Sequence, residues 1–403
     1  MLTELEKVSL RIYKLLFSYF PGFPIDFTKN YDTLYVSKSS LKWIWFFLGL
    51  SVSFLFAVGN SYVVLTREIL KWHKGVGLTR LFLLVGGTVF ILLICLLIAI
   101  LIHVKDENIK AINAMYQLTE DMMRRFRPEA FNSQGKYDND GKTDMLGTCA
   151  CIITFSLGTS PLWLTLAVIY AEFDPFSTLA NDFLPNAEYR SISTILVITL
   201  LRFIAMFIST TEILKLLSFF LLILIVSLRN MLEFMKHLRH KMQENTEQFL
   251  TYYLQIIAIN TMLDAFLGEF FLILITSAFW GTVIGTWVAV RGYGKMEPHI
   301  YGFLLGCLVI CLGITGFFIK KLRAAITMTN EIVATRRMEA KVWYVRMKTR
   351  KAKRLLKRTE ALTPIQFKFG PFFPFSLDFF LEYVNSVLER VVDAILLFDL
   401  DNI

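Results

Sequence analysis

Blocks of apolar residues, each close to or above 20 residues long, alternate with polar segments along the chain. An α-helix needs about 20 apolar residues to cross the hydrocarbon core of a bilayer. Strands that face lipid would alternate polar and apolar residues, and these blocks do not. The pattern therefore predicts an all-α, polytopic membrane protein with seven transmembrane helices, at residues 43–65, 81–104, 146–171, 191–227, 265–290, 300–319 and 376–398.

The helical pattern continues beyond the fourth and sixth spans into polar sequence, which divides the chain into four parts. Residues 1–42 are expected to form a cytosolic N-terminal segment that starts with an amphipathic helix at the inner leaflet. Residues 43–319 hold the first six spans and a cytosolic helical extension near 228–264. Residues 320–375 are a basic cytosolic helix and linker, and residues 376–403 are the seventh span with a short extracellular tail.

Composition supports a membrane protein with lipid as a partner. Of the 403 residues, 55% are hydrophobic and 19% are charged, and the mean hydropathy is +0.54. A soluble domain of this length would need more polar surface to cover its core. The net charge of +9 is concentrated in one loop beside the membrane, so it does not imply a nucleic acid partner.

The basic residues predict the orientation. If the N-terminus is cytosolic, 32 Lys and Arg residues lie inside and 7 outside, which satisfies the positive-inside rule. Only the first loop, with Arg67, Lys71, Lys74 and Arg80, runs against it. We therefore expect a multi-pass protein of the plasma membrane with its N-terminus in the cytosol and its C-terminus outside.

Acidic residues recur every three to four positions along the last span and form one stripe on a helix. The stripe comprises Asp378, Glu382, Ser386 (or Asn385), Glu389 and Asp393. Carboxylates in hydrocarbon cost several kcal/mol each unless they face water or a partner. Repeated around a symmetric oligomer, the stripe would line a pore with acidic rings that favour cations. The alternatives are a helix lying flat on the membrane surface, or one whose polar face packs on another domain.

Aromatic side chains collect in the expected outer halves of spans two to six, where a pocket for a small apolar molecule would be built. The candidates are Phe82, Trp163, Tyr170, Phe203, Phe279 and Trp280, together with the charged Arg202. An aromatic belt at the membrane interface would give the same composition. Arg202 would then snorkel or bond to a carbonyl rather than meet an anionic ligand.

Two further charged features have structural interpretations. Glu212 and Lys215 are three residues apart in the fourth span and are expected to pair with each other. Residues 320–358 hold fourteen Lys and Arg, which suits either a solvated helix near anionic lipid or a cytosolic stalk for assembly.

No motif of an enzyme or a metal site stands out. The sequence has no Gly-Lys phosphate-binding loop, no His-Glu-x-x-His and no Gly-x-Ser-x-Gly. The five histidines are few and scattered, and the pair His237 and His240 lacks completing ligands nearby. We therefore expect no catalytic residues, no metal site, no cofactor and no enzymatic activity.

The C-terminal residues resemble the arthropod gustatory and odorant receptor superfamily. The run FKFGPFFPFSLDFFLEY at 367–383 is similar to the entry to that family's final span. The family signature there is Thr-Tyr, five hydrophobic residues and Gln-Phe, whereas this chain has Glu382-Tyr383, VNSVL and Glu389-Arg390. The layout of spans resembles the family over the whole chain, and the sequence does so over about 35 residues. The departures identify the chain as a divergent member that is closer to the gustatory side.

The resemblance implies a chemosensory receptor that acts as a ligand-gated, non-selective cation channel. It implies a homo- or hetero-tetramer in which the seventh helix of each subunit lines a central pore for monovalent and divalent cations. The cytosolic helices would join the subunits, and each subunit would hold a small-molecule ligand in its outer half.

Two other classes stay open. A heptahelical G-protein-coupled receptor would place its N-terminus outside, against the charge count, and the chain lacks both the Asp/Glu-Arg-Tyr and the Asn-Pro-x-x-Tyr motifs of that class. A non-conducting transporter or scaffold is the other alternative, although the chain shows no inverted repeat of interrupted spans.

Overall fold

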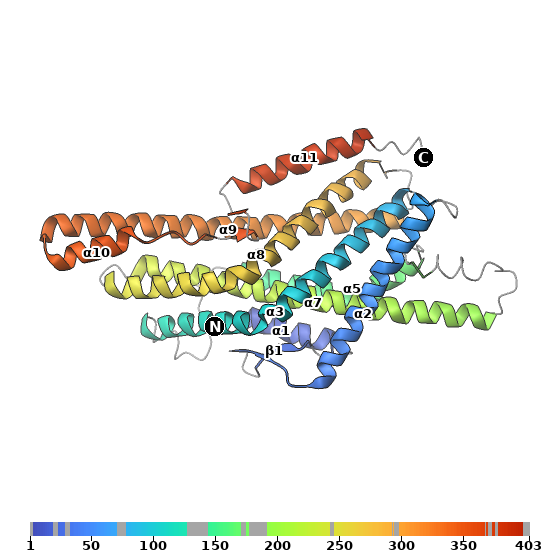
Figure 1. The fold of residues 1–403 in the computed structure, drawn as a ribbon, viewed down its shortest axis with the longest axis horizontal. Helices are drawn as coiled ribbons and strands as arrows, with labels where there is room; N and C mark the ends of the chain where they lie inside the picture. Colours follow the sequence, from blue (N-terminus) through green and yellow to red (C-terminus); the bar gives the residue numbers. More distant parts are fainter. Residues whose placement is uncertain are drawn as a thin grey trace. The chain divides into compact units, whose positions relative to one another are not determined.

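A computed structural model shows a chain built almost entirely of helices (Figure 1). The structure describes residues 3–18, 23–28, 33–70, 78–126, 144–170, 175–176, 192–241, 246–291, 293, 298–366, 368–369, 373–374 and 378–397. The chain forms two compact units, with residues 1–103 and 129–226 in unit 1 and residues 104–128 and 227–402 in unit 2. Helices α3 (Leu78–Phe126) and α7 (Ile192–Lys241) contribute to both units.

Each predicted span falls on a helix of its own. The other five helices are α2 (Ser40–Val64), α5 (Met145–Tyr170), α8 (Thr246–Arg291), α9 (Pro298–Met347) and α11 (Phe379–Leu397). Among the described residues, three stretches are long and apolar enough to cross a membrane, at Ser40–Arg67, Met145–Tyr170 and Thr194–Arg239. Leu84–Leu96 and Phe271–Trp287 are shorter apolar stretches. The chain is therefore a multi-pass helical membrane protein, while the seven-span topology stays a prediction.

Short elements that the sequence pattern did not predict lie between the long helices. The strands β1 (Ile25–Phe27) and β2 (Leu34–Val36) form one antiparallel hairpin, and β3 (Lys368–Phe369) and β4 (Phe373–Pro374) form another. A π-helical turn, η1 (Leu65–Ile69), ends α2. Strands of two or three residues are too short to produce a readable alternation of polar and apolar residues, which is why the all-α expectation omitted them.

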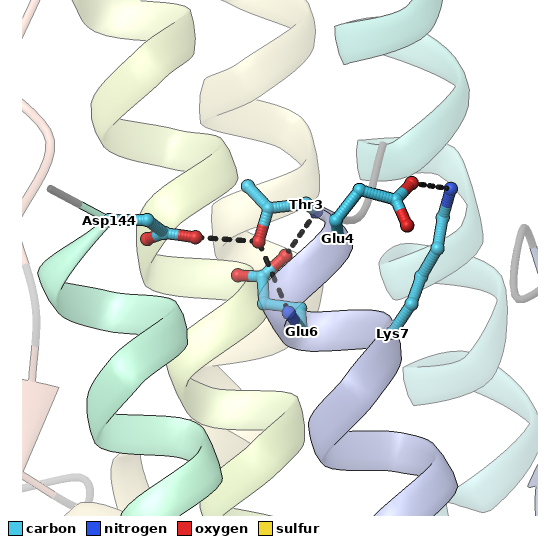
Figure 2. A network of polar contacts seen from close by, with 5 residues as sticks. All are labelled: Thr3, Glu4, Glu6, Lys7 and Asp144. Carbon is cyan, nitrogen blue, oxygen red and sulfur yellow. Dashed lines mark hydrogen bonds and ion pairs between the residues drawn. The ribbon is translucent and has the colours of Figure 1, made fainter. Parts of the chain in front are cut away.

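The N-terminal helix α1 (Glu4–Leu16) and helix α5 are joined at their starts by the Thr3 side chain (Figure 2). The Thr3 hydroxyl oxygen accepts the Glu6 backbone N–H at 3.2 Å, and the Glu6 carboxylate accepts the Thr3 backbone N–H at 2.9 Å. These two bonds form a capping box, which satisfies N–H groups that a helix leaves unpaired. The same hydroxyl donates to Asp144 Oδ2 at 2.6 Å, and Asp144 Oδ1 accepts the Gly147 N–H at 2.9 Å. One hydroxyl therefore connects the caps of two helices.

Helix α1 runs along α5 in the same direction. Leu5 lies beside Gly147 near the start of α5, and Leu16 lies beside Gly158 about three turns further on. A Cβ atom at either glycine would collide with the neighbouring leucine side chain. The two glycines therefore allow the close approach of α1 to α5.

We expect Gly158→Leu to loosen α1 from α5, because the new side chain would occupy the space of Leu16. Overpacking of this kind typically costs about 1–3 kcal/mol of folding free energy. Thermal unfolding of the purified protein in detergent, combined with limited proteolysis of residues 1–40, measures the effect. Gly86→Leu is the matched control, since no heavy atom lies within 4 Å of a Cβ built there. Equal unfolding midpoints for the two variants would contradict the packing described here.

An aromatic cluster fixes the N-terminal segment within unit 1. The Phe23 ring lies 4.9 Å from Phe219 of α7 and 5.3 Å from Phe46 of α2, and Tyr13 lies 6.0 Å from Phe219. Aromatic pairs at such separations add to the stabilisation that comes from burying their surface. Burial, and to a smaller extent the Asp26 carboxylate, raises the pKa of Tyr13 well above its usual value, so the hydroxyl stays neutral.

In unit 2, Arg336 of α9 contacts the start of α8 and the end of α7. Its guanidinium lies 4.6 Å from the ring centre of Phe249 on α8, and its Nη1 atom donates to Glu339 at 2.7 Å. A second nitrogen reaches the Leu238 carbonyl near the end of α7 at 3.5 Å. The side chain is almost fully buried. Charge, stacking and carbonyl contacts together compensate the cost of removing this cation from water.

Side chains of α8 and α9 hold the segment that leads from α10 (Arg350–Glu360) towards the last helix. The Tyr253 hydroxyl donates to the Thr363 carbonyl at 2.9 Å, and Arg337 donates to the Leu362 carbonyl at 2.5 Å. Asn260 makes a longer bond of 3.4 Å to the Gln366 carbonyl. Burial raises the pKa of Tyr253, which keeps its hydroxyl protonated and able to donate.

Candidate functional site

The acidic stripe of the last helix lies on the exposed side of α11. The side chains of Asp378, Glu382, Ser386, Glu389 and Asp393 are all exposed. The helix buries Tyr383, Val387 and Val391 instead, at a spacing of four residues. A helix places residues at this spacing on one face, so the buried face and the acidic stripe are distinct sides of α11.

The buried face of α11 packs on α8. Val283 is the buried centre of the α8 side, and Ile275 and Phe279 pack around it. The Phe279 and Tyr383 rings meet edge to face with their centres 5.9 Å apart. Tyr383, the one signature residue that this chain retains, therefore lies at the contact of the last helix with its neighbour.

The apolar side of α11 is broader than the face it buries. Val391 is buried, and Val384 is partly buried against the same cluster. Leu381, Leu388, Val392 and Leu396 are exposed although they are apolar. One chain alone therefore leaves two stripes of α11 uncovered, one acidic and one apolar.

Arg390 pairs with the carboxylate that lies one turn ahead of it. The Arg390 Nη1 atom is 3.2 Å from Asp393 Oδ2, and both side chains are more than half exposed. The pair offsets one of the four carboxylates of the stripe. Asp378, Glu382 and Glu389 form no ion pair among the described residues.

The predicted ligand-pocket residues do not gather at one point of either unit. Trp163 and Tyr170 on α5 are 70% and 72% exposed, as expected for residues in an aromatic belt. Phe203 stacks on Phe207 with 5.9 Å between ring centres, and the adjacent Arg202 is partly buried. The Phe82 side chain lies outside the part that the structure describes.

The other two predicted pocket residues belong to unit 2. Phe279 is partly buried against α11, and its neighbour Trp280 is 51% exposed. The two rings touch edge to face, 5.5 Å apart. The ligand pocket thus stays a prediction from the sequence.

A different group of side chains converges inside unit 1. Phe56 and Ala57 of α2 meet Ile91 of α3 and Met206 of α7. Val168, Ile169 and Phe176 pack around them. Asn60, one turn beyond Phe56, is buried, and its Oδ1 atom has no hydrogen-bond partner among the described residues. The sequence gives no distinct signal for this cluster, because its apolar residues follow the ordinary pattern of packed spans.

A small cavity lies between α2, α3 and α7 of unit 1. It is lined by Ser53, Cys95 and Glu212 among mostly apolar side chains. It offers space for about one water molecule, which is too small for an organic ligand. Ser53 and Ser209 share a hydrogen bond of 2.9 Å nearby.

Glu212 and Lys215 form the expected ion pair and are buried. The Lys215 Nζ atom lies 2.5 Å from Glu212 Oε1, and the same carboxylate oxygen accepts the Trp45 indole N–H at 3.1 Å. Only 2% of the Lys215 side chain and 7% of the Glu212 side chain are exposed. The pairing was expected from the sequence, whereas the contact with Trp45, which links α7 to α2, was not.

The fold is shared with a solved receptor. The chain is similar to the insect olfactory receptor OR5 from Machilis hrabei, with a TM-score of 0.57, 12% identity and coverage of 96% of both chains. It is also similar to the same receptor in complex with eugenol, with a TM-score of 0.57 and 13% identity over 98% of this chain and 99% of that one. No family model matches the chain, and no curated protein matches it.

At this low identity the likeness shows the fold alone. The chain has the fold of the insect olfactory receptor OR5. The resemblance that the C-terminal residues carry is therefore confirmed at the level of the fold. The choice between the gustatory and the odorant side stays a prediction.

Proposed function

We propose that this chain is a chemosensory receptor of the plasma membrane that acts as a ligand-gated, non-selective cation channel. The observation that carries the proposal is the position of the carboxylates on α11. The helix packs on α8 through Tyr383, Val387 and Val391, and it leaves the acidic stripe uncovered. Ionised carboxylates at membrane depth need water or a partner. A water-filled path shared between subunits supplies both.

The two uncovered stripes of α11 support an oligomer with a central axis. If the acidic stripe faces the axis, four copies place carboxylates in successive rings, which attract cations. The exposed Leu381, Leu388 and Val392 then face a neighbouring copy or lipid, where apolar side chains are stable. With Arg390 offsetting Asp393, each subunit keeps a net negative stripe.

Exposed apolar residues on α9 support subunit contacts in the cytosol. Met338, Val342 and Val345 are each about two-thirds exposed and recur at helical spacing. They lie well beyond Ile319, where the predicted sixth span ends. A stripe of this kind in water is typical of a surface that another protein covers. It fits the tetramer that the family resemblance implies.

The ligand is proposed to be a small, mostly apolar molecule. The similar olfactory receptor OR5 was solved in complex with eugenol, which favours this class of ligand. Trp163, Tyr170, Arg202 and the other predicted residues stay candidates for the pocket.

Expression in oocytes tests the proposal. We expect a small odorant or tastant from a screened panel to evoke a cation current that reverses near 0 mV in sodium and potassium solutions. Epitope tags, stained without permeabilisation, should be detected at the C-terminus and not at the N-terminus. Staining of the N-terminal tag on intact cells would place the N-terminus outside and would favour a G-protein-coupled receptor. Images of the purified oligomer, viewed along the membrane normal, should show fourfold symmetry. Its absence would favour a transporter or scaffold.

A further inference from the structure

We propose that the outer face of α10 binds an acidic segment of a different protein in the cytosol. This inference rests on the proposed topology, in which α9 leaves the membrane near Ile319. It concerns the basic run from Lys341 to Arg358, which holds nine Lys and Arg and no Asp or Glu. The sequence left two interpretations of this run open, namely anionic lipid and a stalk for assembly.

Helix α10 folds back along α9 (Figure 1). Lys348 makes the turn with a φ of 50°, and the Thr349 hydroxyl accepts the Ala352 N–H at 3.2 Å to cap the new helix. Ala352, Leu355 and Thr359 are buried, so they form the face of α10 that is turned to the protein. The position of the buried face fixes which cations point outward.

Five cations occupy the outer side of α10. Arg350, Arg354 and Lys357 lie at helical spacing directly opposite the buried face, and Lys353 and Arg358 flank them. All five are exposed, and none forms an ion pair among the described residues. Lys351 is the exception on this helix, because its Nζ atom lies 3.4 Å from Glu247 of α8. Glu360, the one acidic residue of α10, lies at its C-terminal end, so the outer face keeps an excess of positive charge.

The distance from the bilayer excludes lipid headgroups as the partner of this face. Met347 lies 28 residues beyond Ile319 on the same helix, which corresponds to about 42 Å at 1.5 Å per residue. Helix α10 returns over about 16 Å of that distance. Its cations then stay more than about 20 Å from the membrane, whereas physiological salt screens charge within about 8 Å.

A second copy of this chain does not fit the face either. Packing identical cationic faces together would place like charges side by side, which is unfavourable at an interface. The exposed apolar stripe of Met338, Val342 and Val345 is the surface of α9 that suits identical copies. The outer face of α10 is thus left for a partner of opposite charge.

The shape of the face favours a polypeptide over a small anion or RNA. Its cations line a convex helix surface, while small anions are usually held in concave sites. The outer face also lacks the aromatic side chains on which bases of single-stranded RNA stack. An acidic helix with Glu or Asp every three to four residues would match the row of cations.

A binding experiment with the full-length protein in detergent tests this proposal. The probe is a fluorescent synthetic helix that carries Glu at every third or fourth position. We expect Arg350→Gln/Arg354→Gln/Lys357→Gln to weaken binding about ten- to a hundredfold, since three charge pairs are lost. Lys320→Gln/Lys321→Gln/Arg323→Gln removes the same number of charges near the membrane and should change affinity less than about twofold. Equal losses in the two variants would overturn the proposal.

Reversing the charge of three cations on the outer face of α10 provides a second test. Arg350→Glu/Arg354→Glu/Lys357→Glu should lose the Glu probe and bind the matching Lys probe instead. Displacement of the Glu probe by poly-uridylate, by inorganic polyphosphate or by phosphatidylserine vesicles, at equal charge concentration, would overturn the proposal in favour of RNA, a small anion or lipid. Ligand-evoked current is measured separately on the same variants, so a failed channel proposal and a failed docking proposal give different results.

Discussion

Replacing Glu389 by Gln and Asp393 by Asn together is expected to reduce the preference of the current for calcium over sodium about tenfold. A unit charge acting on another about 4 Å away in water is worth about 1 kcal/mol, and a divalent ion feels twice that. Four subunits would lose two rings of carboxylates at one end of the stripe. Reversal potentials in calcium-only and sodium-only external solutions measure the change.

The Arg390–Asp393 pair predicts how the single variants at these positions differ in calcium selectivity. Removing Asp393 alone leaves the Arg390 charge without its partner at 3.2 Å, so Asp393→Asn should repel cations more than Glu389→Gln does. Arg390→Gln should act in the opposite direction and strengthen the preference for calcium. Adding Arg390→Gln to Asp393→Asn should therefore restore part of the lost selectivity.

The control for these variants removes two acids elsewhere. Asp106→Asn/Glu107→Gln neutralises two exposed carboxylates on α3, outside the proposed pore. It should leave reversal potentials unchanged. If the Glu389 and Asp393 variants behave in the same way as this control, α11 does not line the pore.

The sequence predicted what depends on long-range patterns of polarity. Each apolar block became part of a helix, because a helix forms all of its backbone hydrogen bonds within one segment and so satisfies the backbone in lipid. The acidic stripe was readable for the same reason, since carboxylates recurring at helical spacing are rare in spans. The pair Glu212 and Lys215 was also predictable, because residues three apart on a helix are neighbours.

Details that depend on tertiary contacts could not be predicted. Tyr383 and Val387, rather than Leu381 and Leu388, form the buried face of α11, because the neighbouring α8 decides which of several apolar residues is covered. Trp45 reaches Glu212 across 167 residues of sequence, and no local pattern signals such a bond. Aromatic residues suit both a pocket and an interfacial belt, so composition alone did not separate Trp163 from a ligand-binding residue.

Breaking the buried Glu212–Lys215 pair is expected to have the largest effect on stability. In Lys215→Met the Glu212 carboxylate would keep the Trp45 N–H at 3.1 Å and lose the Lys215 cation at 2.5 Å. Removing one partner of a buried pair typically costs about 3–5 kcal/mol, because an uncompensated charge stays inside the protein. The unfolding midpoint of the purified protein in detergent should fall accordingly, together with the amount that reaches the cell surface.

A paired replacement separates the charge from the packing. Glu212→Gln/Lys215→Met removes both charges and keeps an oxygen that accepts the Trp45 N–H, so most of the lost stability should return. The exposed pair of Arg239 and Glu331, 3.1 Å apart and about half exposed, provides the comparison. Arg239→Met should cost less than about 1 kcal/mol, since water solvates the remaining carboxylate. If Lys215→Met is no more destabilising than Arg239→Met, water reaches Glu212 in the folded protein and the pair is not the buried link between α7 and α2.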